Sequence, residues 1–460
     1  MLKVFNTMSR ELEELAPLDG KTVRLYTCGP TVYNAAHIGN FRTYVFEDLL
    51  RRQIQRNGFG IVQVMNLTDV DDKTIRGAQA AGVSLDAYTA PFKQMFFEDI
   101  DKLGIERAEH YPAATDHIAE VIALIERLFA KGYAYQSEDG SVYFSIAKFA
   151  SYGRLARVDL AGMRAGARVA QDEYEKENVA DFALWKAWDE QDGAVRWDSP
   201  WGPGRPGWHI ECSAMSMRYL GESFDIHTGG VDNMFPHHDD EIAQSECATG
   251  KLFVKYWMHS AHLIVDGKKM SKSAGNFYTL REVLAKGYSG REVRYVLLSA
   301  HYRQQLNFTF EAVDAAKVAL GRVDAFSDRL QTHGGAGAAL PDWALEARRA
   351  FDAAMNNDLN VPEALAAVFA LVHAGNKAMD QGESGFGQAV LALMEDMDRV
   401  LGVLVKPVAA IPAEVQLLVD QRAAARAGKD WKESDRVRDV LAEMGWTVRD
   451  TPEGQKVSPR

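Results

Sequence analysis

The alternation of apolar and polar residues near the start of the chain predicts strands and helices in turn. Thr22–Thr27 has the period of a strand and runs into a Gly-Pro turn. Residues 41–57 carry apolar side chains at helical spacing and stop at Asn57-Gly58, and a second strand is predicted over 61–67. Strand, helix and strand in this order form a βαβ unit, whose chemistry normally lies beyond the carboxyl ends of its strands.

The alternation of strand and helix signals weakens between residues 111 and 200, where we expect an inserted module. A helix is predicted over 116–131, followed by a strand signal near Gly132. The open-sheet pattern resumes at 224–232, and a helix is predicted to open at Pro236, because proline is tolerated at the first helical position. The sheet is therefore expected to be split in sequence.

The chain beyond Ser289 has a mainly helical pattern. Long helical segments are predicted at 343–355 and 362–379, and the glycine-rich segment 334–337 is predicted to be a loop between helices. The pattern favours a helical bundle.

Composition agrees with an ordinary folded protein of several domains. The chain has 460 residues, of which 47% are hydrophobic and 25% charged, so disorder, collagen-like repeats and disulfide scaffolds are disfavoured. The net charge of −12 argues against non-specific wrapping of nucleic acid. The last 60 residues are nearly balanced, with ten basic and nine acidic side chains. Any polyanionic partner must therefore meet a local basic surface.

The three cysteines, Cys28, Cys212 and Cys247, are few and far apart, which favours reduced thiols over a secreted disulfide framework. The N-terminus lacks the pattern of a signal peptide, and no run approaches 18 apolar residues. We expect a cytoplasmic protein with no membrane partner.

Two segments carry the residue types that bind phosphates. His37-Ile38-Gly39-Asn40 precedes the first long helix, where backbone N–H groups and the helix dipole favour an anion. A histidine at a helix start is more often a capping or packing residue. Lys268–Asn276, in which Lys269 to Ser273 read K-M-S-K-S, follows an apolar strand at 263–265 through an Asp266-Gly267 turn. Its lysines can neutralise charge as a pyrophosphate leaves.

Metal ligands are offered by Cys28, Cys212, His237 and Glu241. His237 and Glu241 lie one helical turn apart on one face, and thiolate, imidazole and carboxylate suit zinc. Each residue alone also has an ordinary structural interpretation, and together they can form one site across the sheet. Cys247 has no such neighbours and is interpreted as a core thiol.

Taken together, the motifs resemble those of the cysteinyl-tRNA synthetases, a family of class I aminoacyl-tRNA synthetases, over nearly the whole chain. The matching strings are Phe5-Asn6-Thr7, Tyr26 to Tyr33, Asn66 to Lys73, Gly207 to Ser213, Phe235 to His238, Lys269 to Ser273 and Asp358 to Ala364.

The resemblance implies ATP-dependent activation of L-cysteine to cysteinyl adenylate and transfer to the terminal adenosine of tRNA(Cys). It implies one Zn²⁺ per chain, held by Cys28, Cys212, His237 and Glu241, that binds the substrate sulfur as a thiolate and rejects serine. ATP is expected to act with Mg²⁺. Four protein ligands usually close a zinc site, so we expect Glu241 to be the most displaceable.

The resemblance also assigns roles to the remaining candidates. Residues expected around the cysteine substrate are Gly29, Thr68, Trp208, His227 and Asp232, with Asp232 the partner of the substrate ammonium group. The expected ATP-binding residues are His37, Asn40, Lys269 and Lys272, of which His37 and Lys272 are expected to be catalytic. The family pattern has a second histidine where this chain has Asn40, so Asn40 keeps a neutral donor and loses a titratable one.

The expected fold is an α/β, Rossmann-like parallel-sheet catalytic domain split by an insertion, then a helical bundle and a small C-terminal anticodon-binding domain. The expected boundaries are 1–112 and 201–250 for the two catalytic halves, 113–200 for the insertion, 251–310 for a stem-contact region with the lysine loop, 311–405 for the bundle and 406–460 for the anticodon-binding domain. A monomer is expected.

Three alternatives compete with this interpretation. A cysteine:amino-sugar ligase of the mycothiol type shares the zinc and ATP motifs, but the segment from Gln421 to Trp446 resembles an anticodon-recognition domain. A non-catalytic tRNA-binding homologue is disfavoured by the intact His37, Lys272 and zinc ligands. A zinc hydrolase leaves the lysine loop unexplained.

Overall fold

The computed structural model describes residues 1–158, 181–271, 275–333, 339–406, 412–451 and 454–459. These residues form two compact units, Met1–Leu404 and Val405–Arg460, and each unit is described by itself. No helix in the described ranges is both long enough and apolar enough to pass through a lipid bilayer.

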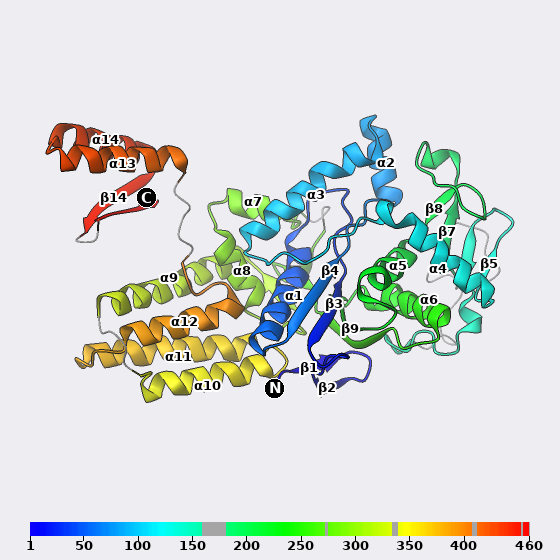
Figure 1. Cartoon of the computed structure of the whole chain (residues 1–460), viewed down its shortest axis with the longest axis horizontal. Coiled ribbons are helices and arrows are strands. Elements are labelled where there is room, and N and C mark those ends of the chain that lie inside the picture. The colour runs from blue at the N-terminus through cyan, green and yellow to red at the C-terminus, as the bar shows by residue number, and fades with distance from the viewer. Residues whose placement is uncertain (159–180, 272–274, 334–338, 407–411, 452–453, 460) are drawn as a thin grey trace. The chain divides into compact units, whose positions relative to one another are not determined.

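The first unit is built on a four-stranded parallel sheet in the order β10-β9-β3-β4 (Figure 1). The strands are β3 (Thr22–Thr27), β4 (Gly60–Met65), β9 (Phe224–Gly230) and β10 (Val254–Ser260). The prediction of a parallel sheet split in sequence is confirmed. The chain runs from β3 to one side of the sheet and from β9 to the other, so the boundary between β3 and β9 is the topological switch point where such sheets bind ligands.

Helices cover both faces of this sheet. Figure 1 shows α1 (Ile38–Arg56) on one side and α5 (Trp208–Leu220) and α6 (Asp239–Thr249) on the other. The apolar stripe of α1 is buried in the main core, as its spacing predicts. The helix begins three residues before the predicted Phe41, because His37 supplies its N-terminal cap.

The start of α6 differs from the prediction. Pro236 lies in an irregular turn, Met234–His238, and regular α-helix begins only at Asp239. Phe235 has φ −141° and ψ 128°, which is extended backbone. The residue before a proline is disfavoured in the α conformation, which accounts for the extended Phe235 inside this turn.

The segment between β4 and β9 carries a sheet of its own. Four antiparallel strands stand in the order β5-β6-β7-β8, and α4 (Ile118–Ala130) packs with them in a separate apolar cluster. The strands are β5 (Ala134–Gln136), β6 (Val142–Phe144), β7 (Phe182–Ala187) and β8 (Gly204–Pro206). Pro206 lies on the edge strand β8, where a missing N–H is tolerated.

Short elements connect these layers. A β1–β2 hairpin (Lys3–Asn6 and Glu11–Glu14) opens the chain, and α2 (Asp72–Ala81) and α3 (Leu85–Lys102) follow β4. A small sheet β12-β11-β13 contains Lys268–Lys269, Leu263–Val265 and Leu306–Phe308. Asp266 and Gly267 have φ of 51° and 73°, so the predicted turn before the lysine loop is confirmed.

The chain beyond Ser289 is mainly helical, as predicted, up to its last hairpin. The remaining helices of the first unit are α7 (Leu280–Ala285), α8 (Gly290–Leu298), α9 (Phe310–Thr332), α10 (Asp342–Asn356), α11 (Val361–Asp380) and α12 (Gly387–Leu401). The predicted loop 334–337 falls outside the described residues.

The second unit pairs α13 (Ala413–Ala427) and α14 (Trp431–Glu443) with a hairpin of β14 (Trp446–Thr451) and β15 (Gly454–Pro459). The hairpin was missed, because its strands carry many polar residues and no strong alternation.

Candidate active site

The carboxyl ends of β3 and β9 meet α5 and the start of α6 at one buried cluster of ligand-type side chains. Cys28 follows β3, Cys212 lies on α5, His237 precedes α6 and Glu241 lies in its first turn. Their ligand atoms are all within 4.8 Å of one another. The structure therefore brings together the four residues that the sequence suggested for a metal, although they come from three separate parts of the chain.

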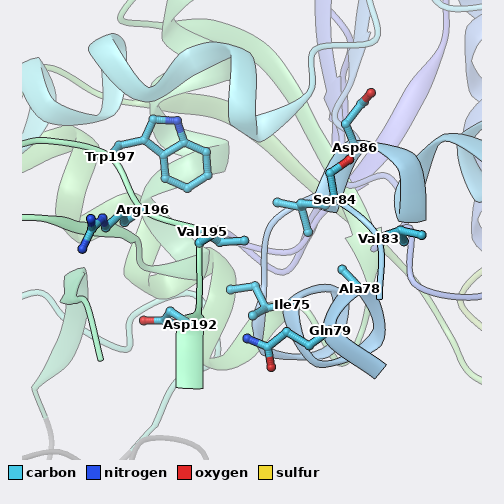
Figure 2. A pocket seen from close by; sticks show the side chains of 12 residues that line it. Ile75, Ala78, Gln79, Val83, Ser84, Asp86, Asp192, Val195, Arg196 and Trp197 are labelled. Carbon is cyan, nitrogen blue, oxygen red and sulfur yellow. The ribbon is translucent and has the colours of Figure 1, made fainter. Parts of the chain in front are cut away.

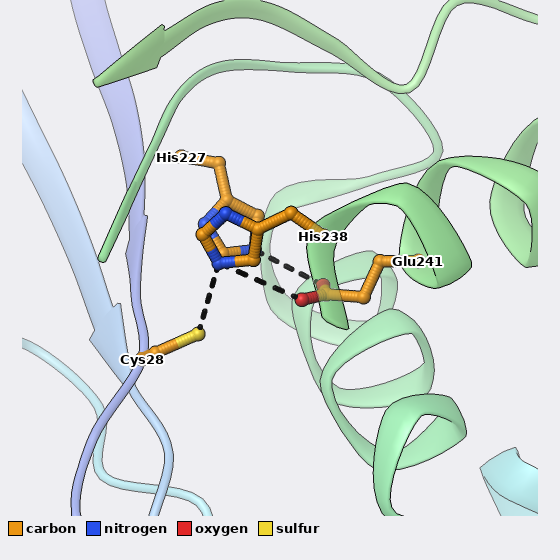
Figure 3. A group of neighbouring side chains, drawn as sticks. All are labelled: Cys28, His227, His238 and Glu241. Carbon is orange, nitrogen blue, oxygen red and sulfur yellow. Dashed lines mark hydrogen bonds and ion pairs between the residues drawn. The ribbon is translucent and has the colours of Figure 1, made fainter. Parts of the chain in front are cut away.

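A second group overlaps the first. Cys28 and Glu241 also lie within 4.8 Å of His227 and His238. Figure 3 shows both imidazoles between the thiol and the carboxylate: Nε2 of His238 is 3.4 Å from Sγ of Cys28, and Nε2 of His227 is 3.0 Å from Oε2 of Glu241. Sequence analysis did not assign a role to His238, because periodicity cannot tell which of two adjacent histidines faces the sheet.

The donor set of the first group fits zinc. Its side chains are buried apart from the partly exposed Cys28, and Oε1 of Glu241 has no hydrogen-bond donor although His237 lies 3.2 Å away. Two sulfurs, one imidazole and one carboxylate are ligands that zinc accepts in tetrahedral sites. The residues present therefore fit the metal that the sequence motifs imply.

Burial sets the protonation of these groups in the absence of a cation. A hydrogen bond with Cys212, together with burial, raises the pKa of Cys28 well above its ordinary value. Burial and nearby Glu241 raise the pKa of Cys212 despite its hydrogen bond with Cys28, and burial lowers the pKa of His237 to about 3. Burial thus favours the neutral imidazole, which is the form of histidine that ligates metals, and the protonated form of both thiols.

Further histidines orient this cluster. Nδ1 of His238 hydrogen-bonds to Nε2 of His259 (2.8 Å), whose Nδ1 hydrogen-bonds to Oγ1 of Thr7 (2.8 Å). Nδ1 of His209 lies 2.7 Å from Nδ1 of His237. Such outer partners fix ring orientation at metal sites. His209 and His259 were not singled out from the sequence, although His209 stood inside a matching string.

The residues expected around the amino acid adjoin the cluster. The N–H of Gly29 donates to Oδ1 of Asn66 (2.9 Å), and Nδ2 of Asn66 donates to Oγ1 of Thr68 (3.1 Å). A Cβ at Gly29 would lie 1.8 Å from the backbone oxygen of Asn66, so only glycine fits beside that strand end. Asn66 is thus a positioning residue for two of the expected substrate contacts.

Trp208 and Asp232 are the exposed members of the expected substrate residues. Trp208 is 42% exposed, and its ring centroid is 4.5 Å from that of His237. Asp232 lies exposed in the turn after β9. Together with His227, which contacts Glu241, the structure places these expected substrate residues around the same strand ends.

His37 caps α1. Its Nδ1 accepts from the N–H of Asn40 (3.2 Å), and Oδ1 of Asn40 accepts from the N–H of His37 (3.1 Å). This reciprocal pair is a capping box. Burial lowers the pKa of His37 against the opposing effect of Asp232, so the imidazole is neutral near pH 7. Asn40, which departs from the family pattern, therefore has a structural task that uses its carbonyl oxygen.

The end of the lysine loop lies against the same helix start. A Cβ at Gly39 would lie 3.0 Å from Cε of Met270, the N–H of Ile38 donates to the oxygen of Tyr278 (3.0 Å), and the rings of His37 and Phe277 meet edge to face. The two phosphate-type motifs are thus neighbours. Lys269 is exposed on β12, and Lys272 falls outside the described residues.

Two cavities lie near the insertion. One of about 360 Å³ is lined mainly by apolar residues of α2, the α2–α3 turn and residues 192–197, and Figure 2 shows Ile75, Val195 and Trp197 around it. It contains none of the candidate site residues. The other, of about 200 Å³, is bordered by Trp208 and His209 and so adjoins the metal-type cluster.

Comparison with known families matches almost the whole chain. Residues 14–318 match the tRNA synthetases class I (C) catalytic domain, residues 350–405 a DALR domain, and residues 409–457 the cysteinyl-tRNA ligase anticodon binding domain.

Individual proteins that are similar to this chain point to the same family. The cysteine–tRNA ligase of Protochlamydia amoebophila (strain UWE25) is 52% identical over 99% of this chain and 97% of its own length, and that of Chlamydia muridarum (strain MoPn / Nigg) is 49% identical over 99% of each.

Among solved structures, Mycobacterium tuberculosis methionyl-tRNA synthetase in complex with methionyl-adenylate superposes with a TM-score of 0.59 at 16% identity, covering 87% of this chain and 94% of that one. The ternary complex of Agrobacterium radiobacter K84 agnB2 LeuRS superposes with the same TM-score at 12% identity, covering 84% of each chain. These two likenesses concern the fold, which is that of the class I synthetases. With about half of its residues identical to curated relatives over nearly its full length, the chain belongs to the cysteine–tRNA ligase family of class I aminoacyl-tRNA synthetases.

Proposed function

We propose that the protein is a cysteine–tRNA ligase that activates L-cysteine with ATP and transfers it to the terminal adenosine of tRNA(Cys). The observation that carries this proposal is the 52% identity to a cysteine–tRNA ligase over 99% of the chain, together with the match of residues 409–457 to its anticodon binding domain. An amino-sugar ligase and a non-catalytic homologue are not favoured by these relatives.

Cys28, Cys212, His237 and Glu241 are proposed to hold one zinc ion. Two neighbouring sulfurs support this set over the overlapping group with His227 and His238, because thiolate pairs favour zinc. When bound there, zinc supplies a Lewis acid that selects a thiolate over the hydroxyl of serine. His209 contacts His237 and is proposed to orient it. His238 contacts Cys28 and is proposed to orient that ligand.

The remaining site residues position cysteine for attack. Gly29, Thr68 and Trp208 are proposed to enclose it, and the exposed carboxylate of Asp232 to bind its ammonium group. His227, stacked on Trp257 with a centroid distance of 4.7 Å, is held against Glu241 on the buried side of the cluster.

The phosphates of ATP, with Mg²⁺, are proposed to lie at the start of α1. There His37 offers a neutral ring N–H at the positive end of the helix dipole, and Lys269 and Lys272 supply positive charge to the departing pyrophosphate. We propose that Asn40 acts chiefly through the cap it forms with His37.

We propose the domain boundaries that the sequence predicts. We also propose that the enzyme is a monomer and that it is cytoplasmic. The three unpaired cysteines support a reducing compartment. Light scattering of the purified protein tests the oligomeric state.

Charging of purified tRNA(Cys) with labelled cysteine and ATP tests the function, with an amino-sugar acceptor as the parallel reaction. Label on the tRNA, with serine rejected, is the expected result. Label only on the sugar would contradict the proposal.

The metal assignment has its own test. Cys212→Ser should abolish stoichiometric zinc binding, measured by atomic absorption, whereas His238→Asn should retain bound zinc with an affinity lowered about 10- to 100-fold. The reverse pattern would favour the group that contains His227 and His238.

A further inference from the structure

The insertion reaches the metal-type cluster through residues 152–156. Two backbone N–H groups of this segment donate to the carboxylate of Asp239 (3.1 and 3.2 Å), and the hydroxyl of Tyr152 donates to Asp240. These two aspartates stand directly before Glu241 in the first turn of α6. The acidic start of α6 therefore ties the insertion to the turn that also carries a proposed metal ligand.

Asp240 leads from the insertion toward His237. This aspartate is 1% exposed, and its Oδ2 lies 3.3 Å from Nε2 of His209. Nδ1 of His209 lies 2.7 Å from Nδ1 of His237, whose Nε2 lies 3.2 Å from Oε1 of Glu241. A continuous path of polar atoms thus runs from Tyr152 through Asp240 and His209 to a proposed ligand.

The path has one direction for its protons when His237 ligates through Nε2. A ligating Nε2 carries no proton, so the ring proton of a neutral His237 is on Nδ1 and donates to Nδ1 of His209. His209 then keeps its own proton on Nε2, which faces the carboxylate of Asp240. In the opposite direction, His209 would turn an unprotonated nitrogen toward a buried carboxylate, and two acceptors would face each other. The carboxylate of Asp240 therefore favours the tautomer of His237 that can ligate a metal.

We propose that Asp240 and Tyr152 are positioning residues for the metal ligand His237 and act on it through His209. The hydroxyl of Tyr152 fixes the carboxylate, which fixes the tautomer and ring orientation of the first histidine and so of the second. The inference rests on the proposed function, because it concerns the metal site of that function, and it gives the insertion a part in that site. Loss of such an outer carboxylate weakens metal binding by about 10- to 100-fold.

Zinc affinity tests the inference without relying on catalytic activity. The wild type, Asp240→Asn, Tyr152→Phe and the double variant are each titrated with zinc against a chelator of known affinity. Asp240→Asn should bind zinc at least about tenfold more weakly than the wild type, because an amide can donate to Nε2 of His209 and stabilise the opposite tautomer. Tyr152→Phe should have a smaller effect in the same direction. The double variant should be no weaker than Asp240→Asn, because the hydroxyl acts only through the carboxylate.

Asp239→Asn is the matched control. Asp239 lies in the same helix turn and accepts from backbone N–H groups of the same insertion segment. Its substitution disturbs the contact with the insertion and leaves the carboxylate beside His209 in place. The zinc affinity of this variant should therefore stay close to that of the wild type.

The tautomer of His209 has a readout of its own. In protein labelled with ¹⁵N-histidine, the nitrogen shifts of His209 should show a proton on Nε2 in the wild type and on Nδ1 in Asp240→Asn. The signals are assigned by their loss in His209→Gln. Thermal unfolding confirms that each variant is folded.

Equal zinc affinities of Asp240→Asn and Asp239→Asn, or an unchanged His209 tautomer in Asp240→Asn, would overturn the inference. Additive losses from Asp240→Asn and Tyr152→Phe would remove Tyr152 from it. A wild type that charges tRNA(Cys) leaves the proposed function intact under any of these results. A wild type that gives the expected affinities and tautomers but does not charge tRNA(Cys) removes the proposed function and supports the positioning role.

Discussion

The two halves of the candidate active site are built in opposite ways. At the ends of β3 and β9, Cys212, His237 and Glu241 are buried and contact one another through side chains from different elements. At the start of α1, His37 is half-buried, Lys269 is exposed, and the two hydrogen bonds that pair His37 with Asn40 lie within one helix turn. The proposed amino-acid site is thus assembled by packing, whereas the proposed phosphate site uses groups that the local backbone already positions.

This difference predicts different responses to substitution. A change in the buried half removes a partner from a dense polar cluster, where unpaired groups are costly. A change at the helix start can remove chemistry while leaving the fold intact, or remove a cap while leaving the chemistry.

The largest effect is expected in the buried half. Cys212→Ser should lower cysteine-dependent ATP–pyrophosphate exchange by at least ~100-fold, because loss of a ligand should exceed the cost of losing its outer partners. Cys247→Ser is the matched control, since Cys247 is a buried thiol outside the cluster. Equal zinc content and equal exchange rates in Cys212→Ser and Cys247→Ser would contradict this prediction.

His37→Asn separates chemistry from capping at the helix start. Asparagine is a preferred N-cap, so thermal unfolding should stay within the range of the wild type. The exchange rate should fall about 100-fold, as when one preorganised donor to a transition state is lost. A large drop in stability with little loss of rate would instead make His37 a structural residue.

Glu47 is a buried carboxyl whose titration should make the stability of the protein depend on pH. Burial, against a hydrogen bond from Thr228, raises the pKa of this carboxyl to about 8. The folded protein keeps a proton that the unfolded chain loses above about pH 4.3, so stability should fall as pH rises from there to about 8.

The slope due to Glu47 should be at most about 1.4 kcal/mol per pH unit, and Glu47→Gln should remove it. Urea unfolding between pH 5.5 and 8 measures the effect, with the exposed Glu11→Gln as the control. Parallel pH dependence of the wild type and Glu47→Gln would refute the assignment.

The smallest effect is expected for Asn40→Ala. Loss of half of the capping box should cost about 0.5–1 kcal/mol of unfolding free energy, with a modest change in exchange rate. Chemical denaturation and the exchange assay together check this. A loss of rate comparable to that of His37→Asn would show that Asn40 contacts the phosphates directly.

Much of the fold could be predicted because its signals are local. The strand Thr22–Thr27, the helix after it and the turn at Asp266-Gly267 follow from period and turn residues, and the structure confirms them. The hairpin Trp446–Pro459 and the start of α6 were not predicted correctly. A polar hairpin has little periodicity, and Phe235 takes its extended backbone from the proline that follows it.

By itself, the sequence determined the residue types of the site and, through its motifs, the family that they resemble. Only the tertiary structure decided that His238 shares Cys28 with the cluster and that Glu211 lies buried without a partner. These facts depend on how α5, α6 and the insertion pack on the sheet. Packing is set by contacts between residues far apart in sequence, which no local pattern records.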